Sequence, residues 1–140
     1  MQNESAIYEY LPTSQNGNTV EQSFLDKRIR VFGIPEDPLF LARDVAEWID
    51  YSKRPDGSYK LDRMLQSVDE DEKTKIFYPA HNLGGVLQAN TEYWFLTEDG
   101  LYEVLMQSRK PKAKEFKKEV KKILKSIRKT GGYIVGQENK

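Results

Sequence analysis

The stretch that decides the fold is SRKPKAKEFKKEVKKILKSIRKTGGY, residues 108–133. Pro111 suits the first position of a helix, and the glycine pair at 131–132 suits its end. From residue 109 to residue 129 the segment has eleven Lys or Arg against two Glu, a local balance of +9. The rest of the chain has eleven cationic and twenty acidic residues, a balance of −9. The formal neutrality of the protein therefore hides a strongly basic helix.

Two opposite faces are expected on this helix. At about 100° per residue, its apolar side chains fall within an arc of about 100°, which predicts a stripe buried in the core. The stripe consists of Ala113, Phe116, Val120, Ile123, Leu124 and Ile127. The cationic side chains fall on the opposite side, and they are Lys114, Lys117, Lys118, Lys121, Lys122, Lys125, Arg128 and Lys129. Since Glu115 and Glu119 lie on the flank, nothing anionic interrupts the cationic face.

The cationic face indicates an anionic partner. Five like-charge pairs are spaced four residues apart, from Lys114 with Lys118 to Lys125 with Lys129. Each pair is unfavourable by about 0.2–0.5 kcal/mol in an isolated helix, which totals about 1–2.5 kcal/mol, and two Glu do not cancel it. An anionic partner would relieve this repulsion. The alternative is a solvated surface helix whose apolar stripe carries the cost by packing.

Nucleic acid is the polyanion that best fits the helix. About 19 residues give about 28 Å, enough to lie along a duplex backbone or in a major groove. Lysine favours phosphate contacts, which predict strong salt dependence rather than sequence choice. Candidates for reading base edges are Arg43, Arg54, Asn82 and Gln107. An acidic membrane and a coiled coil fit less well, because the stripe is needed by the core, lacks a Trp anchor and spans fewer than two heptads.

The rest of the chain predicts an α+β fold of short antiparallel strands and hairpins packed with several helices. Strands are expected at 20–24, 28–33, 39–42 and 75–79, followed over 86–96 by one long strand or a hairpin bent at Asn90 and Thr91. Helices are expected at 42–50, at 60–67 and after an N-cap at Thr97, with Leu101, Val104 and Leu105 inward. Turns are expected at 25–27, 35–38, 52–58 and 82–85.

One domain over residues 19–135 is expected, since 140 residues suffice for a single core. Residues 1–18 are polar and aperiodic, which predicts a mobile leader, and 136–140 form a C-terminal tail. The chain has no Cys and no apolar run near the roughly 18–20 residues of a membrane span. We therefore expect a soluble cytoplasmic protein without disulfides or a membrane partner.

No pattern typical of catalysis is present. His81 is the only histidine, and no phosphate-binding glycine loop, nucleophile elbow or HExxH occurs. The acidic run at 69–72 lacks the ligand alternation of a calcium loop, and its consecutive acids are expected to point apart. Trp48 and Trp94 lie in apolar patterns that predict core positions. We therefore expect no enzyme activity, no metal and no cofactor.

Several motifs, in this order, resemble the N-terminal domain of the BRO family, which occurs in baculovirus BRO proteins and many phage antirepressors. They are RIRVFG at 28–33, PLFLARDVAEWIDYS at 38–52, DEDEKTKI at 69–76, LGG at 83–85, TEDGLYEVLMQSRKPKAKEFKKEV at 97–120 and SIRKTGGYI at 126–134. The most specific are GLY at 100–102, SRKPKAKEFK at 108–117 and SIRKTGGY at 126–133. The resemblance implies binding of double-stranded DNA by a phage or prophage transcription regulator in the host cytoplasm.

The resemblance also implies which basic positions bind DNA, namely Arg109, Lys110, Lys114, Lys117, Arg128 and Lys129. The predicted DNA-contacting set is therefore Arg109 and Lys110 together with the eight cations of the helix face. The family often has an aromatic residue after FK and a proline before SIRKTGG, where this chain has KEV at 118–120 and Lys125. Without the proline the last helix is expected to run unbroken into Arg128, and the missing aromatic puts any stacking role there in doubt.

A second interpretation stays open beside DNA binding. The lysine face would then capture a phage repressor protein directly, by meeting an acidic patch on it. The sequence also leaves open a homo-oligomer, because DNA-binding modules are commonly paired but no dimer seam is visible. Whether a second, C-terminal domain accompanies this one, as in many such antirepressors, is left open as well.

Overall fold

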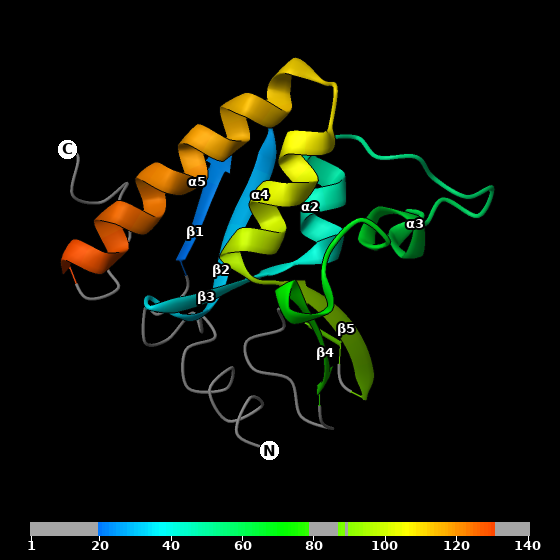
Figure 1. Cartoon of the computed structure of the whole chain (residues 1–140), viewed down its shortest axis with the longest axis horizontal. Helices are drawn as coiled ribbons and strands as arrows, with labels where there is room; N and C mark the ends of the chain where they lie inside the picture. Colours follow the sequence, from blue (N-terminus) through cyan, green and yellow to red (C-terminus); the bar gives the residue numbers. More distant parts are fainter. Residues whose placement is uncertain (1–19, 79–86, 89, 131–140) are drawn as a thin grey trace.

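The computed structural model describes residues 20–78, 87–88 and 90–130, and its fold is α+β, as the sequence predicts (Figure 1). Among these residues, five strands form one antiparallel sheet in the order β1-β2-β3-β5-β4. They are β1 Val20–Phe24, β2 Lys27–Ile34, β3 Asp37–Leu41, β4 Lys73–Tyr78 and β5 Thr91–Leu96. The predicted leader 1–18, turn 82–85, His81 and tail 136–140 lie outside the described residues.

Two of the predicted turns exist but are shorter than expected. The β1–β2 hairpin turns on Leu25 and Asp26, whose φ angles are 51° and 65°, the backbone that a two-residue hairpin requires. Lys27, expected in the turn, is already the first residue of β2. The next turn is also shorter, because Pro38 pairs with Gly33 in the β2–β3 ladder.

Four helices and one 3-10 turn accompany the sheet in the described part of the chain. They are α2 Ala42–Trp48, α3 Leu61–Leu65, the 3-10 turn η1 Glu70–Glu72, α4 Glu98–Gln107 and α5 Pro111–Thr130. Ala42 was expected both at the end of a strand and at the start of a helix. It begins α2, so β3 ends one residue earlier than expected. α2 itself ends two residues before the predicted boundary, because Asp50 has a φ of 50°, which a helix does not permit.

The end of α3 was predicted less well than the course of α5. The helix expected over 60–67 stops at Leu65, whose carbonyl accepts the Val68 amide at 3.1 Å and the Lys73 ammonium at 2.8 Å. Contacts of this kind depend on the fold and leave no local pattern. α5, in contrast, begins at Pro111 and runs unbroken past Lys125, as the absence of a proline there predicts.

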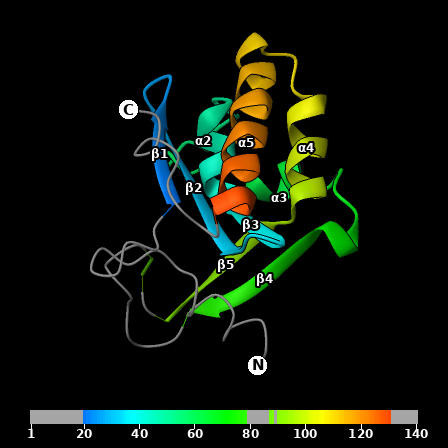
Figure 2. The ribbon, with the colours of Figure 1, turned by 90° about the vertical axis from the view of Figure 1, so that its left-hand side faces the viewer.

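Helices α2, α4 and α5 cover one face of the sheet and bury the main core there (Figures 1 and 2). The six residues of the predicted apolar stripe of α5 are all buried in this core. Phe116 is fully buried, with its ring stacked on Trp48 at 5.2 Å and edge-on to Phe24 at 5.1 Å. These contacts fix α5 against both α2 and β1.

A second, smaller core lies on the opposite face of the sheet. It consists of Phe32, Leu41, Ile76, Leu87, Tyr93 and Phe95. In β5, Tyr93 and Phe95 point to this cluster, whereas Trp94 and Leu96 pack on the main core. Asn90 has a φ of 57° directly before β5, so the single long strand over 86–96 does not form. β5 begins at Thr91 and pairs with β3 and β4, and the described residues do not show the alternative hairpin bent at Asn90 and Thr91 either.

Both tryptophans lie in the core region, as predicted. Trp48 is fully buried and donates its indole N–H to the Arg28 carbonyl at 2.9 Å. Trp94 is half-buried, and the ammonium groups of Lys73 and Lys75 lie 5.9 and 5.3 Å from its ring. The Trp48 ring is therefore not free to act as a stacking platform.

α4 begins as the sequence predicts and packs unusually close to η1. The Thr97 side chain accepts the Gly100 amide at 3.1 Å, which caps the helix. A Cβ at Gly100 would collide with the backbone carbonyl of Glu72. The glycine of the GLY motif at 100–102 is therefore required by helix packing, which local sequence does not reveal.

The acidic run at 69–72 is arranged differently from the expectation. A 3-10 turn curls the chain so that carboxylate oxygens of Asp69, Asp71 and Glu72 all lie within 4.8 Å of one another. The prediction that these acids point apart is therefore wrong for these three, since it assumed an open loop. The cluster lies at the surface, and acidic groups gathered there do not by themselves define a metal site.

Candidate nucleic-acid interface

The predicted cationic face of α5 is on the outside of the molecule. Lys114, Lys118, Lys121, Lys122, Lys125, Arg128 and Lys129 are exposed, and Lys117 is half-buried. Arg109 and Lys110 are also exposed, in the linker between α4 and α5. The twenty residues of α5 form a rod about 30 Å long, held by its apolar stripe. The contacts of the cations, however, differ along the rod.

The N-terminal end of α5 is fastened to the end of α2 by Asp50. The Asp50 carboxylate accepts the ammonium of Lys112 at 2.5 Å and that of Lys27 at 3.3 Å. Its backbone carbonyl accepts the ammonium of Lys110 at 2.8 Å. The bonds from Lys112 and Lys27 hold the pKa of the Asp50 carboxyl below its usual value. Lys110, predicted to contact DNA, is thus already engaged within the domain.

The C-terminal end of α5 is fastened to the start of α4. The Arg128 guanidinium binds a carboxylate oxygen of Glu98 at 2.8 Å and the carbonyl of Pro35 at 3.0 Å. The other Glu98 oxygen accepts the Tyr102 hydroxyl at 2.9 Å, and the Lys121 ammonium lies 5.5 Å from the Tyr102 ring. Burial and the bond to Glu98 raise the pKa of Tyr102, so it stays protonated and donates.

Most of the cations between these two ends, and Lys129 beyond Arg128, lack such partners. Within the described residues, Lys114, Lys117, Lys118, Lys125 and Lys129 have no ion pair or hydrogen bond through their ammonium groups. Lys122 lies 3.8 Å from Glu119, yet its side chain is 67% exposed. Glu119 is buried and also accepts the Gln22 amide at 2.5 Å. A band of ammonium groups therefore faces outward with little compensation.

Two hollows border this band along the crevice between α4 and α5. The first is lined by residues of the linker and of the first turns of α5, including Arg109, Lys114, Lys117 and Lys118. The second lies toward the other end and is lined by Tyr102, Lys121, Leu124, Lys125 and Lys129, with the Glu98–Arg128 pair. Lysines thus line both hollows beside the rod.

The residues proposed to read base edges are not gathered on α5. Arg43 is exposed on α2, with its guanidinium carbon 5.6 Å from the centre of the Tyr93 ring. Arg54 is bound to Asp62 at 2.5 Å, and Gln107 on α4 donates to a neighbouring glutamate. Asn82 lies outside the described residues. Of the described candidates, only Gln107 lies near the predicted DNA-contacting set, because it lines a hollow together with Arg109 and Lys110.

Sequence reasoning missed the acidic residues that fasten the rod. Asp50 is 62 residues from Lys112, Glu98 is 30 residues from Arg128, and Gln22 is 97 residues from Glu119. The only hint in the sequence is the overall excess of acid outside the basic helix. Among the described residues, no helix has both the length and the apolar composition of a membrane span.

Comparison with known proteins gives one family and several viral relatives. The sequence model described as BRO family, N-terminal domain, matches residues 28–126. The putative Bro-N domain-containing protein 201R of Invertebrate iridescent virus 6 is 30% identical, over 93% of this chain and 32% of its own length. The similarly described 019R of Invertebrate iridescent virus 3 is 28% identical, over 88% of this chain and 33% of its own.

A further relative, 289L of Invertebrate iridescent virus 6, carries the same description and is 27% identical, over 81% of this chain and 29% of its own length. The chain thus spans about a third of the length of the curated relatives that it matches. No solved structure matches it significantly.

Proposed function

Because the chain belongs to the BRO family, through the N-terminal domain of that family, we propose that it binds double-stranded DNA. We further propose that it does so within a transcription regulator of the antirepressor type. The outward lysine band in the middle of α5 would lie along the phosphate backbone.

One observation carries the proposal, namely the uncompensated charge in the middle of α5. Lys114, Lys118 and Lys125 are exposed and have no anionic partner among the described residues. Ammonium groups spaced along one rigid rod neutralise successive phosphates and release the counterions that DNA has condensed. That release is entropically favourable and makes binding depend steeply on salt concentration.

The fastened ends of the rod support the same proposal. Because Asp50 holds the start of α5 and Glu98 holds its end, the lysine band keeps one orientation relative to the domain. A band held in place loses little conformational entropy when it meets a straight polyanion. Phosphate contacts of this kind position a protein on DNA but do not select a sequence, so base readers must come from other residues.

A salt titration with matched triple variants tests the proposal. Duplex affinity is measured by fluorescence anisotropy at several salt concentrations, and the logarithm of affinity is plotted against that of salt. The variant with Lys114, Lys118 and Lys125 changed to Gln should flatten the slope by about 2–3 units, since each phosphate contact contributes about 0.9. The control variant changes Lys53, Lys60 and Lys75 to Gln, which removes the same charge outside α5.

The two triple variants separate the proposal from its main rival. An unchanged slope in the α5 variant, or an equal loss in both variants, would show that DNA does not lie on this band. If the lysine face instead captures a repressor protein, duplex binding should be weak while a repressor co-purifies with the domain. A gel shift against viral control regions then tests the proposed regulatory role.

A further inference from the structure

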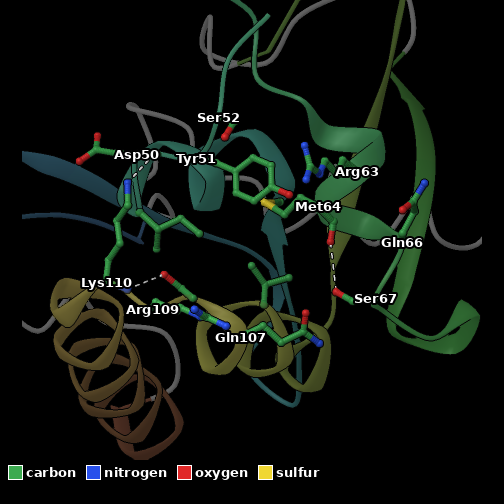
Figure 3. Close-up of a pocket in the computed structure, with 13 residues that line it drawn as sticks. Asp50, Tyr51, Ser52, Arg63, Met64, Gln66, Ser67, Gln107, Arg109 and Lys110 are labelled. Atoms are coloured by element: carbon green, nitrogen blue, oxygen red, sulfur yellow. Dashed lines mark hydrogen bonds between the residues drawn. The ribbon is translucent and has the colours of Figure 1, made fainter.

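A second basic feature lies outside α5, in a hollow between the end of α2, α3 and the end of α4 (Figure 3). The hollow has a volume of about 630 Å³, and Arg63 and Arg109 are among the residues that line it. Arg63 comes from α3 and Arg109 from the linker between α4 and α5, so the two guanidinium groups reach it from different elements. The sequence singled out Arg109 but not Arg63.

Both guanidinium groups lack an anionic partner within the described part of the chain. Arg63 and Arg109 are exposed, and no ion pair or side-chain hydrogen bond joins either to a described residue. Asp50 supplies the one carboxylate among the lining residues, and that carboxylate already binds Lys27 and Lys112. The lining of the hollow therefore has an excess of positive charge.

The other polar groups of the lining suit an anion with several oxygens. Ser52 and Gln66 offer a hydroxyl and an amide that are not bonded to any described residue. Tyr51 and Met64 supply less polar walls (Figure 3). Guanidinium groups present paired N–H donors whose spacing matches the oxygens of a phosphate. The volume lies within the range of small-molecule sites.

The hollow adjoins the lysine band of α5. Ser108, Arg109 and Lys110 line it, and they also line the crevice that contains Lys114 and Lys118. Arg109 therefore stands between the two features. A phosphate held in the hollow would lie at the end of the track that the lysines form.

We propose that Arg63 and Arg109 hold a phosphate group in this hollow. Two sources share that chemistry, namely the backbone of a DNA duplex that lies along α5, and a free nucleotide. The first source rests on the proposed function, whereas the second does not.

The test uses Arg63→Gln and Arg109→Gln, with Lys75→Gln as a control that removes an exposed cation of β4 outside the hollow. In one arm, duplex affinity is measured at several salt concentrations. Each hollow variant should weaken binding by about tenfold or more and flatten the salt slope by about one unit.

In the other arm, deoxyadenosine monophosphate is titrated while the amide resonances of Ser52 and Gln66 are followed by NMR. Thermal unfolding verifies that each variant is folded.

The outcomes separate the two sources and the two proposals. If the hollow variants lose duplex affinity, the bound phosphate belongs to DNA. If both variants abolish the NMR response to deoxyadenosine monophosphate, the hollow binds a free nucleotide. If the wild type binds duplex steeply with salt but neither arm responds to Arg63→Gln or Arg109→Gln, the phosphate site is overturned and the proposed function stands. If the wild type does not bind duplex but its nucleotide response depends on Arg63, the proposed function fails and the site stands.

Discussion

The middle and the ends of α5 carry the same kind of charge but use it differently. At the ends, Lys112 and Arg128 reach carboxylates of the domain at 2.5 and 2.8 Å. In the middle, Lys114, Lys118 and Lys125 reach no described anion, and the helix is held mainly by its apolar side and by the bond from Gln22 to Glu119. Charge at the ends therefore orients the rod, and charge in the middle is left for a partner. A count of lysines alone does not make this distinction.

The sharpest test of how the middle is held is Phe116→Ala. Its ring packs against Trp48 and Phe24 and is fully buried, so truncation leaves a cavity under the lysine band. We expect the free energy of unfolding to fall by about 3–5 kcal/mol, measured by urea denaturation. The adjacent change Lys117→Gln should alter it by about 0.5 kcal/mol or less. Similar losses in both variants would mean that charge, and not packing, holds the middle.

Gly100→Ala tests how α4 supports the C-terminal end of α5. A Cβ there meets the Glu72 carbonyl, so α4, which carries Glu98, has to move away from η1. Overpacking of this kind costs about 1–3 kcal/mol, which urea denaturation can measure. Met106→Ala, at an exposed site of the same helix, is the control and should cost little. If Gly100→Ala leaves the free energy of unfolding unchanged, η1 can shift to make room for the methyl group at little cost.

The fastening at the N-terminal end is tested by Asp50→Asn, since asparagine tolerates the positive φ of this position. Its half-exposed carboxylate binds two ammonium groups, and we expect a loss of about 0.5–1 kcal/mol at neutral pH. Folding lowers the pKa of the Asp50 carboxyl. Its contribution to the free energy of unfolding is therefore complete above the pKa of Asp50 in the unfolded chain, which is about 4. It disappears as the pH falls through the lower folded-state pKa. Denaturation of both proteins from pH 7 to pH 2 checks this, and a difference that persists at the acidic end would contradict it.

The smallest effect on stability is expected for Arg128→Gln, because it removes one half-exposed ion pair, whereas Asp50→Asn removes two. We expect a change of about 0–1 kcal/mol. The comparison with Lys125→Gln is made in the DNA salt titration, where Lys125 should contribute about one unit of slope and Arg128 clearly less. An equal contribution from both would show that the end of the rod releases Glu98 and joins the middle in binding.

Much of this molecule follows from local patterns. The apolar stripe from Ala113 to Ile127, the Thr97 cap and the strands at 20–24 and 28–33 were predicted and formed, because side-chain period and capping act over a few residues. The errors lie at element ends such as Leu65, where a partner several residues away decides. The acidic run at 69–72 was misjudged for a different reason, since a 3-10 turn within the run itself gathers its carboxylates.

By itself, the sequence determined the amphipathic basic helix, the α+β class and the family resemblance, since all three depend on residue order along short segments. Only the tertiary structure decided which cations remain free, which close contact requires Gly100, and that Arg63 and Arg109 line one hollow. The physical reason is distance along the chain. Coulomb attraction and van der Waals contact act over a few ångströms, and the fold alone brings residues such as Asp50 and Lys112, 62 positions apart, within that range.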